Sequence, residues 1–295
     1  MRRDDFVDAA LFSVLATSWA LNYPLSKIAL ELVDPLQLTL LRFSMAIPFL
    51  ALLMPRGFRP LKGLRTNATA ALFGALDLLL STFLWFEGER YTTPSVASII
   101  IYTYPILITV MGAAFLGERV SGRRASGAAL GFAGVAVAFS GDVRIHGLAG
   151  PLLLLGAAFS FSAAAVIYRK YLSGEDFASV STYHLIYAAA MAAALSAALG
   201  VPLPQAYLIA KLAPVLLVMS FPGTAVAYTI YVYLYSRHEL ASVAPYLFAV
   251  PALSVLFSYV IMGIPLNPTE LIGLAMLAIG IYVSSTGGAR APRPA

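Results

Sequence analysis

Cysteine is absent from the 295-residue sequence, and only three histidines occur. The absence of cysteine excludes disulfide bonds, thiolate nucleophiles and cysteine metal ligands. The histidines His146, His184 and His238 are too scattered to form a metal-ligand pattern. The sequence therefore predicts no metal site and no thiol chemistry.

Charged residues are also scarce. They make up 11% of the chain, against roughly 25% in soluble proteins, whereas 60% of the residues are hydrophobic. A soluble domain of this length could not bury so many apolar side chains, so we predict an integral membrane protein in contact with the lipid bilayer. The net charge of +5 is not accompanied by a basic face with interleaved aromatic residues, and we expect no nucleic-acid partner.

The sequence does contain apolar runs separated by short charged or Pro/Gly breaks. Each run suits the roughly 20 residues of one crossing, and lipid-facing backbone must satisfy its own hydrogen bonds, which favours helices. The first run exceeds the roughly 7–15 apolar residues of a signal peptide, so we expect an uncleaved helix. We predict an all-α membrane protein with ten spans, at residues 8–32, 36–55, 67–87, 93–116, 123–141, 148–170, 178–200, 211–235, 241–263 and 269–287.

The two halves of the chain match each other. A constant shift of 146 positions places eight residues of the first half on identical residues of the second, which indicates an internal duplication. We predict two five-helix units, residues 1–146 and 147–295. Because five crossings are an odd number, the second unit is inverted, and inverted repeats place a substrate site at their interface near the bilayer midplane. The matched residues of the first half are Pro105, Leu107, Gly117, Gly127, Ala129, Gly134, Val137 and Gly141.

The distribution of Lys and Arg predicts the orientation of the chain in the membrane. With the N-terminus inside, fourteen basic residues flank the inner ends of the spans. Only four lie toward the outer ends, namely Lys27, Arg90, Arg144 and Lys211. By the positive-inside rule we expect both termini in the cytoplasm.

Several segments carry a family likeness. TSWALNYPLSKIAL at 17–30, DPLQLTLLRF at 34–43 and YTTPSVASIIIYTYPILITVMGAAFLGERVS at 91–121 resemble the EamA repeat of the drug/metabolite transporter superfamily. The second copy departs from this pattern, because MGIPLNP replaces the LGER exit at 262–268. The resemblance implies a ten-helix metabolite transporter of the cell membrane, often an exporter, without a bound cofactor. Members handle amino acids, nucleosides, sugar conjugates, aromatic toxins and other solutes, so the substrate does not carry over.

Two charged residues stand out within the predicted spans. Arg42 lies about seven residues inside its span, roughly 10 Å deep at 1.5 Å per residue. It suits a substrate carboxylate or phosphate, although snorkelling to the headgroups or pairing with Asp77 remains an alternative. Asp77 lies near the middle of its span and either balances Arg42 or exchanges a proton. His184, which a shift of 142 places on Arg42, is a second candidate for proton coupling.

Aromatic and polar side chains recur at helical spacing in several spans. Tyr228 and Tyr231 share one face, and Tyr102 precedes Pro105 as Phe248 precedes Pro251 in the second copy. Such rings suit a pocket wall, but ordinary packing against a kink accounts for them almost equally well. The predicted substrate-binding residues are Trp19, Asn22, Tyr23, Arg42, Asp77, Tyr102, Tyr228, Tyr231, Tyr246 and Phe248.

These observations favour a secondary transporter that exports small organic metabolites such as amino acids. A nucleotide-sugar or phosphorylated-metabolite antiporter is the alternative, but such substrates carry at least two negative charges, and only Arg42, with Lys27 near the rim, is placed to receive them. A membrane-embedded enzyme or lipid-handling protein would need clustered catalytic groups on facing helices, which the sequence lacks. We therefore predict no enzymatic activity. A homodimer remains an open alternative.

Overall fold

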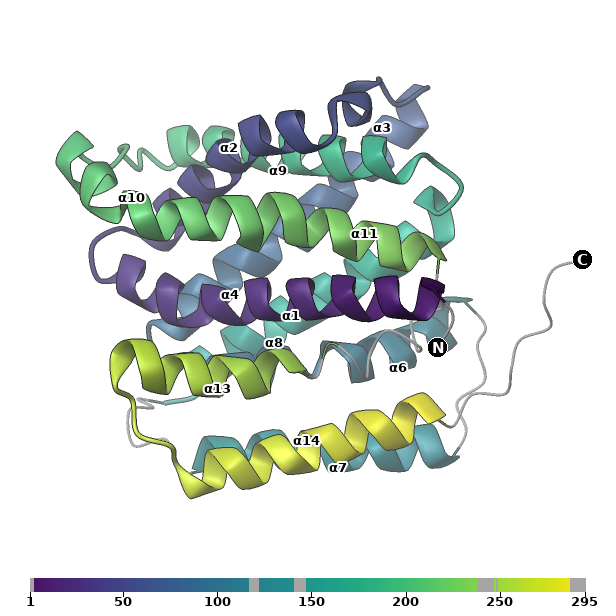
Figure 1. The fold of residues 1–295 in the computed structure, drawn as a ribbon, viewed down its shortest axis with the longest axis vertical. Helices are drawn as coiled ribbons and strands as arrows, with labels where there is room; N and C mark the ends of the chain where they lie inside the picture. The colour runs from purple at the N-terminus through teal and green to yellow at the C-terminus, as the bar shows by residue number, and fades with distance from the viewer. Residues whose placement is uncertain (1–2, 117–121, 141–146, 238–246, 248, 287–295) are drawn as a thin grey trace, which may run out of the picture.

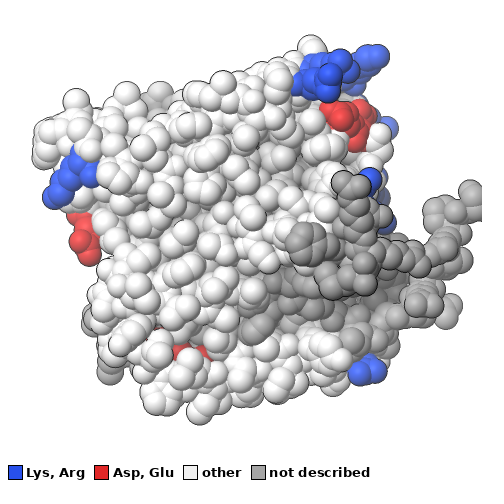
Figure 2. Space-filling model, viewed as in Figure 1, with Lys and Arg blue, Asp and Glu red and all other residues white. Residues whose placement is uncertain are grey.

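The computed structural model describes residues 3–116, 122–140, 147–237, 247 and 249–286. All regular elements within these residues are helical, and the long helices run side by side as one bundle (Figure 1). Figure 2 shows charged residues at the two ends of the helices and a broad uncharged band between them. This distribution suits a bundle that crosses a bilayer.

The described residues form the ten predicted membrane helices, of which α1 (Arg3–Leu30) is the first. Six spans, Pro35–Leu53, Leu64–Glu89, Pro94–Leu116, Ala149–Leu172, Phe177–Ala198 and Ala206–Leu234, are each long and apolar enough to cross a bilayer, and Ala125–Ala138, Ala249–Met262 and Pro268–Val283 are shorter apolar helices. The elements are α1 (Arg3–Leu30), α2 (Pro35–Leu53), η1 (Pro55–Phe58), α3 (Leu64–Gly74), η2 (Ala75–Leu80), α4 (Ser81–Glu89), α5 (Pro94–Ile101), α6 (Tyr104–Leu116), α7 (Gly122–Ser140), α8 (Ala149–Ile167), η3 (Tyr168–Leu172), α9 (Phe177–Ala198), α10 (Ala206–Ser220), η4 (Phe221–Val226), α11 (Ala227–Arg237), α13 (Ala249–Met262) and α14 (Pro268–Thr286).

The predicted span 93–116 is not one continuous helix. It is divided into α5 and α6, with a turn at residues 102–103. Pro105 explains the break, because it has no N–H for the carbonyl of Ile101 and its ring would clash with that carbonyl. The Thr103 hydroxyl donates to the Ile100 carbonyl at 2.8 Å and satisfies part of the interrupted backbone. For the predicted span 241–263, α13 begins at Ala249, and Pro245 lies outside the described residues.

Helices α7 and α14 lie side by side at one edge of the bundle (Figure 1). A Cβ atom on Gly134 would lie 2.7 Å from the carbonyl oxygen of Gly273, and one on Gly280 would lie 2.6 Å from that of Gly127. The shift of 146 positions relates Gly134 to Gly280 and Gly127 to Gly273, so each contact is the counterpart of the other. As the residue number rises along α7, the number of the contacted residue on α14 falls. Corresponding helices of the two halves therefore meet antiparallel and reciprocally, as inverted repeats require. The glycines permit the close approach of their backbones.

Three segments among the described residues are π-helical. One of them, η3, follows the end of α8, and the other two interrupt long central helices. Segment η2 covers Ala75–Leu80 and η4 covers Phe221–Val226. A shift of 146 superimposes the two ranges residue for residue. π-Helical turns are rare and recur at functional sites, so their presence in both copies directs attention to the middle of the bundle.

Candidate functional site: a central cavity between the halves

A cavity lies in the middle of the bundle. It has a volume of about 50 Å³, enough for several water molecules because one needs roughly 10–15 Å³ measured in the same way. Its walls come from α1, α2, α4, α5 and α6 of the first half and from α8 and α11 of the second. It is lined by Trp19, Asn22, Tyr23, Arg42, Ser81, Thr82, Trp85, Ile101, Tyr102, Tyr104, Ala157, Phe161 and Tyr228.

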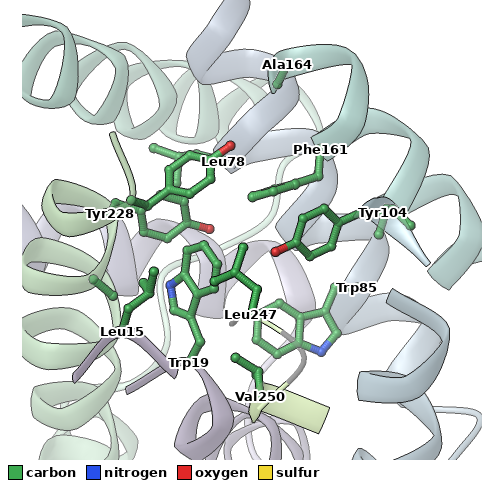
Figure 3. Packing of buried hydrophobic residues seen from close by; sticks show 14 of the residues in the cluster. Leu15, Trp19, Leu78, Trp85, Tyr104, Phe161, Ala164, Tyr228, Leu247 and Val250 are labelled. Carbon is green, nitrogen blue, oxygen red and sulfur yellow. The ribbon is translucent and has the colours of Figure 1, made fainter. Parts of the chain in front are cut away.

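Aromatic rings form most of the cavity wall. The ring centre of Trp19 lies 5.4 Å from that of Tyr228 and 6.0 Å from that of Phe161, and Phe161 meets Tyr104 edge to face at 4.8 Å. Figure 3 shows these rings arriving from different helices and turning toward one another. Tilted and edge-to-face contacts of this kind are favourable for aromatic pairs. The wall is apolar, with a few polar groups set into it.

Arg42 is the cation of the cavity. Its side chain is buried, its Nε donates to the Thr224 hydroxyl at 2.7 Å, and its Nη2 donates to the Gly223 carbonyl at 3.1 Å. The guanidinium also lies 5.6 Å from the centre of the Trp85 ring. Among the described residues, Nη1 has no hydrogen-bond partner. Arg42 therefore keeps one strong donor for a ligand while η4 holds the rest of its guanidinium in place.

Asn22 connects α1 to the same π-helical segment. Its Nδ2 donates to the Gly223 carbonyl at 3.2 Å, whereas its Oδ1 has no hydrogen-bond partner in the described part of the chain. A Cβ atom on residue 223 would lie closest to Asn22 Oδ1, with Nδ2 at 2.8 Å, so the Asn22 amide packs directly against the backbone of Gly223. Asn22 thus lines the cavity and, like Arg42, is held against η4.

Asp77 pairs with His184 and not with Arg42. Both side chains are fully buried, and Asp77 Oδ2 lies 3.5 Å from His184 Nε2. His184 Nδ1 lies 3.0 Å from the Val180 carbonyl, an acceptor, which assigns a proton to Nδ1 and leaves Nε2 to face the carboxyl group. A proton between Nε2 and Oδ2 would satisfy both. The two residues that the sequence singled out for proton coupling are therefore neighbours.

The two buried pairs occupy equivalent places in the two halves. The 142-position shift relates Arg42 to His184, and the 146-position shift relates Gly223 to Asp77. Arg42 of the first half contacts η4 of the second half, and His184 of the second half contacts η2 of the first half. Asp77 itself does not line the cavity, but the Ser81 hydroxyl, which does, donates to the Asp77 carbonyl.

The structure brings most of the predicted site residues together. Trp19, Asn22, Tyr23, Arg42, Tyr102 and Tyr228 line the cavity. Tyr231 is buried behind it, 5.4 Å from the ring of Trp19 and 5.3 Å from that of Phe161. Tyr246 and Phe248 lie outside the described residues. That these side chains bind a substrate stays a prediction.

Sequence reasoning missed about half of the lining residues. Ser81 and Trp85 share a helical face with Asp77, so a signal for them was present in the sequence. Tyr104 and Phe161 have no such signal, because they lie in almost wholly apolar segments and only the packing of α6 against α8 brings them together. The missed residues are Ser81, Thr82, Trp85, Ile101, Tyr104, Ala157 and Phe161.

Comparison with known proteins gives a consistent result. The pattern described as "EamA-like transporter family" matches the chain twice, over residues 9–140 and 148–286. The chain is 27% identical over 285 residues to "Uncharacterized transporter YvbV" of Bacillus subtilis (strain 168), covering 94% of this chain and 91% of that protein. It is 26% identical over 298 residues to the "Probable amino-acid metabolite efflux pump" of Escherichia coli (strain K12), covering 97% and 96% of the two proteins.

A solved crystal structure shares the fold. It superimposes with a TM-score of 0.71 at 19% sequence identity and covers 94% of this chain and 96% of its own. At this identity the likeness concerns the arrangement of the helices. The arrangement of the helices is thus that of a known architecture.

Proposed function

The chain belongs to the EamA-like transporter family, and from this we propose that it exports small carboxylated metabolites, amino acids among them, by alternating access to the central cavity. It is a multi-pass membrane transporter and not an enzyme. The proposal concerns the class of substrate, the direction of transport and the site that binds the substrate.

The observation that carries the proposal is the free Nη1 donor of Arg42 in the cavity wall. A guanidinium binds a carboxylate through charge-assisted hydrogen bonds, which are stronger than neutral ones. Asn22 also lines the cavity and supplies a polar amide group for the ammonium end of such a ligand. Together with the aromatic wall, these groups suit a zwitterion that carries an apolar or aromatic side chain.

The single cation also supports this choice over the phosphorylated alternative. Within the described residues, Arg42 is the only Lys or Arg that lines the cavity. A nucleotide sugar carries at least two negative charges, which one guanidinium would leave partly unpaired in an apolar site. The name of the Escherichia coli relative, an amino-acid metabolite efflux pump, agrees with a substrate of one negative charge.

We also propose that the N- and C-termini lie in the cytoplasm and that the two units are residues 1–146 and 147–295. Basic residues are more frequent at the end of the bundle where α1 begins, which supports this orientation by the positive-inside rule. At that end the structure describes Arg56, Arg59, Lys62, Arg65, Arg123, Arg169, Lys170 and Arg237, against Lys27, Arg90 and Lys211 at the other.

Counterflow tests the proposed function. Proteoliposomes preloaded with unlabelled amino acids should accumulate labelled amino acid from outside, and protein-free liposomes and unloaded proteoliposomes should not. Uptake that depends on the preload is the signature of a carrier. Counterflow of a nucleotide sugar without any counterflow of amino acids would contradict the proposal.

A further inference from the structure

Glu89 is a buried carboxyl group to which the cavity assigns no role. It is the last residue of α4 and is 0% exposed. Its Oε2 lies 2.5 Å from the Ser26 hydroxyl of α1. The Trp85 side chain is the neighbouring donor on α4, but among the described residues no donor lies within 3.5 Å of Oε1. An ionised carboxylate with a bare buried oxygen is costly, whereas a neutral carboxylic acid is much less so.

The hydrogen bonds of Ser26 also indicate that Glu89 is protonated. The Ser26 hydroxyl has one hydrogen but lies within hydrogen-bond distance of two oxygens, Glu89 Oε2 at 2.5 Å and the Tyr23 carbonyl at 2.9 Å. A carbonyl only accepts, so both contacts are satisfied at once when Ser26 donates to Tyr23 and Glu89 donates to Ser26. That arrangement requires a proton on Glu89.

The neighbouring cation is engaged with the backbone. Lys27 donates to the main-chain carbonyls of Glu89 at 2.6 Å and Thr92 at 2.7 Å, where α4 ends. Its charge lies beside the carboxyl group and would favour release of the proton, in opposition to burial. The other charged groups nearby are Glu87 of α4 and Arg90, which follows the end of α4; they pair with each other at 3.3 Å in a partly exposed position. The guanidinium of Arg42 lies 5.6 Å from the ring of Trp85, one turn before Glu89 on α4. Tyr23 is the neighbouring phenol on α1.

This carboxyl group lies one helical turn beyond the cavity. Trp85 precedes Glu89 by one turn of α4, and Tyr23 precedes Ser26 by one turn of α1. The rings of Tyr23 and Trp85 both line the cavity, with their centres 4.5 Å apart. The Glu89–Ser26 hydrogen bond therefore joins the same two helices that hold this part of the cavity wall together.

We propose that Glu89 and Ser26 form a proton-binding site that is occupied in this conformation and releases its proton during the transport cycle. Loss of the proton leaves an anion between α1 and α4 and breaks the chain of hydrogen bonds to Tyr23. The contact between α1 and α4 then changes, and the aromatic wall of the cavity changes with it. A proton is the ligand that the site fits, because the ammonium group of Lys27 beside it opposes a metal cation. The coupling part of this inference rests on the proposed transport function.

The proton itself can be tested without transport. Infrared difference spectroscopy of the purified full-length protein between acid and alkaline pH should show the carbonyl band of a buried carboxylic acid. Glu89→Gln should lower the intensity of that band, to which buried Asp77 contributes when it is protonated, and Glu87→Gln, which changes a partly exposed carboxylate of the same helix, should leave it unchanged. A spectrum of Glu89→Gln with the band intact would overturn the site.

The coupling is tested in proteoliposomes. We expect a pH gradient to drive accumulation by the wild type and by Glu87→Gln. Glu89→Gln, which resembles the protonated form, should keep counterflow within about two-fold of the wild type but lose the gradient-driven accumulation. Gradient-driven uptake that survives Glu89→Gln and is lost in Asp77→Asn would assign coupling to the Asp77–His184 pair and overturn the inference. A wild type that shows counterflow but no response to the gradient would also overturn it. Absence of counterflow in the wild type would instead contradict the proposed function, and the infrared test would still decide the proton site.

Discussion

At the scale of single residues, Arg42 and Asn22 of the central cavity are both held by the same π-helical segment. Arg42 and Asn22 both donate to the Gly223 carbonyl, and Arg42 also donates to Thr224, which lies in the same π-helical segment. Each side chain keeps one unpartnered atom among the described residues. A buried donor or acceptor without a hydrogen bond costs free energy. A ligand that forms a hydrogen bond with one of these atoms would therefore gain most in binding free energy.

Replacing Arg42 with Gln should weaken the binding of a carboxylated ligand. A hydrogen bond to a charged group contributes about 1.5–3 kcal/mol, which corresponds to a loss of roughly 10- to 100-fold in affinity. Ligand-induced thermal stabilisation of purified protein measures this loss. Arg90→Gln is the matched control, because Arg90 is exposed and pairs only with Glu87 in the described structure.

An analogue without a carboxylate separates contact from folding in that experiment. The amide of the same amino acid keeps the ammonium group but lacks the carboxylate, so Arg42→Gln should not weaken its binding. Equal losses for the acid and the amide would mean that Arg42 shapes the cavity without touching the carboxylate.

At the scale of helices, two devices are repeated in both halves. The π-helical segments η2 and η4 free main-chain groups near the cavity, and the glycines of α7 and α14 let their backbones meet. The glycine contact is reciprocal, so a change on either helix should have a similar effect. At the α7–α14 contact, glycine is required because the backbone of the other helix lies too close for a side chain.

Gly134→Ala and Gly280→Ala should each destabilise the bundle. Their Cβ atoms would lie under 3 Å from backbone atoms of the opposite helix, and overpacking of this kind costs typically about 1–3 kcal/mol. Gly122→Ala on the same helix is the control, because nothing lies within 4 Å of its Cβ position. Thermal unfolding in detergent should show lower transition temperatures for the first two variants only. An unchanged Gly134→Ala protein would show that the helices can separate without cost.

The sequence predicted the helices better than their interruptions. The ten spans were predicted from apolar runs, and the duplication was predicted from matched residues. Both are patterns in the linear sequence and do not depend on how the helices pack. The π-helical turns and the break before Pro105 were not located, although Pro105 was among the residues matched in the second half. Whether a proline kinks a helix, widens a turn or divides it depends on which neighbouring helix can satisfy the freed carbonyl.

Partners across the bundle were the least predictable feature. From the sequence, Asp77 could balance Arg42 or exchange a proton, and the structure places it against His184. Glu89 is adjacent to Arg90 at the end of a span and resembles an interfacial residue in the sequence. Its burial is evident only once Ser26 and Lys27 of α1 are packed against it. Lateral packing of helices decides such pairs, and helical periodicity does not encode it.

At the scale of the whole molecule, the two inverted halves enclose one cavity whose walls come from both. Alternating access requires that this cavity open to each side of the membrane in turn. The absence of cysteine makes the natural sequence a ready background for introducing one thiol at a time. The reactivity of a thiol in the cavity wall from each side of the membrane therefore tests alternating access directly.

The decisive measurement is the labelling of Thr82→Cys by a membrane-impermeant thiol reagent, in vesicles of both orientations. Thr82 lines the cavity, so we predict that this variant reacts from both faces and that bound substrate slows both reactions. Ser173→Cys and Gln205→Cys, at exposed positions on opposite ends of the bundle, should each react from one face only. Reaction of Thr82→Cys from a single face under all conditions would contradict alternating access through this cavity.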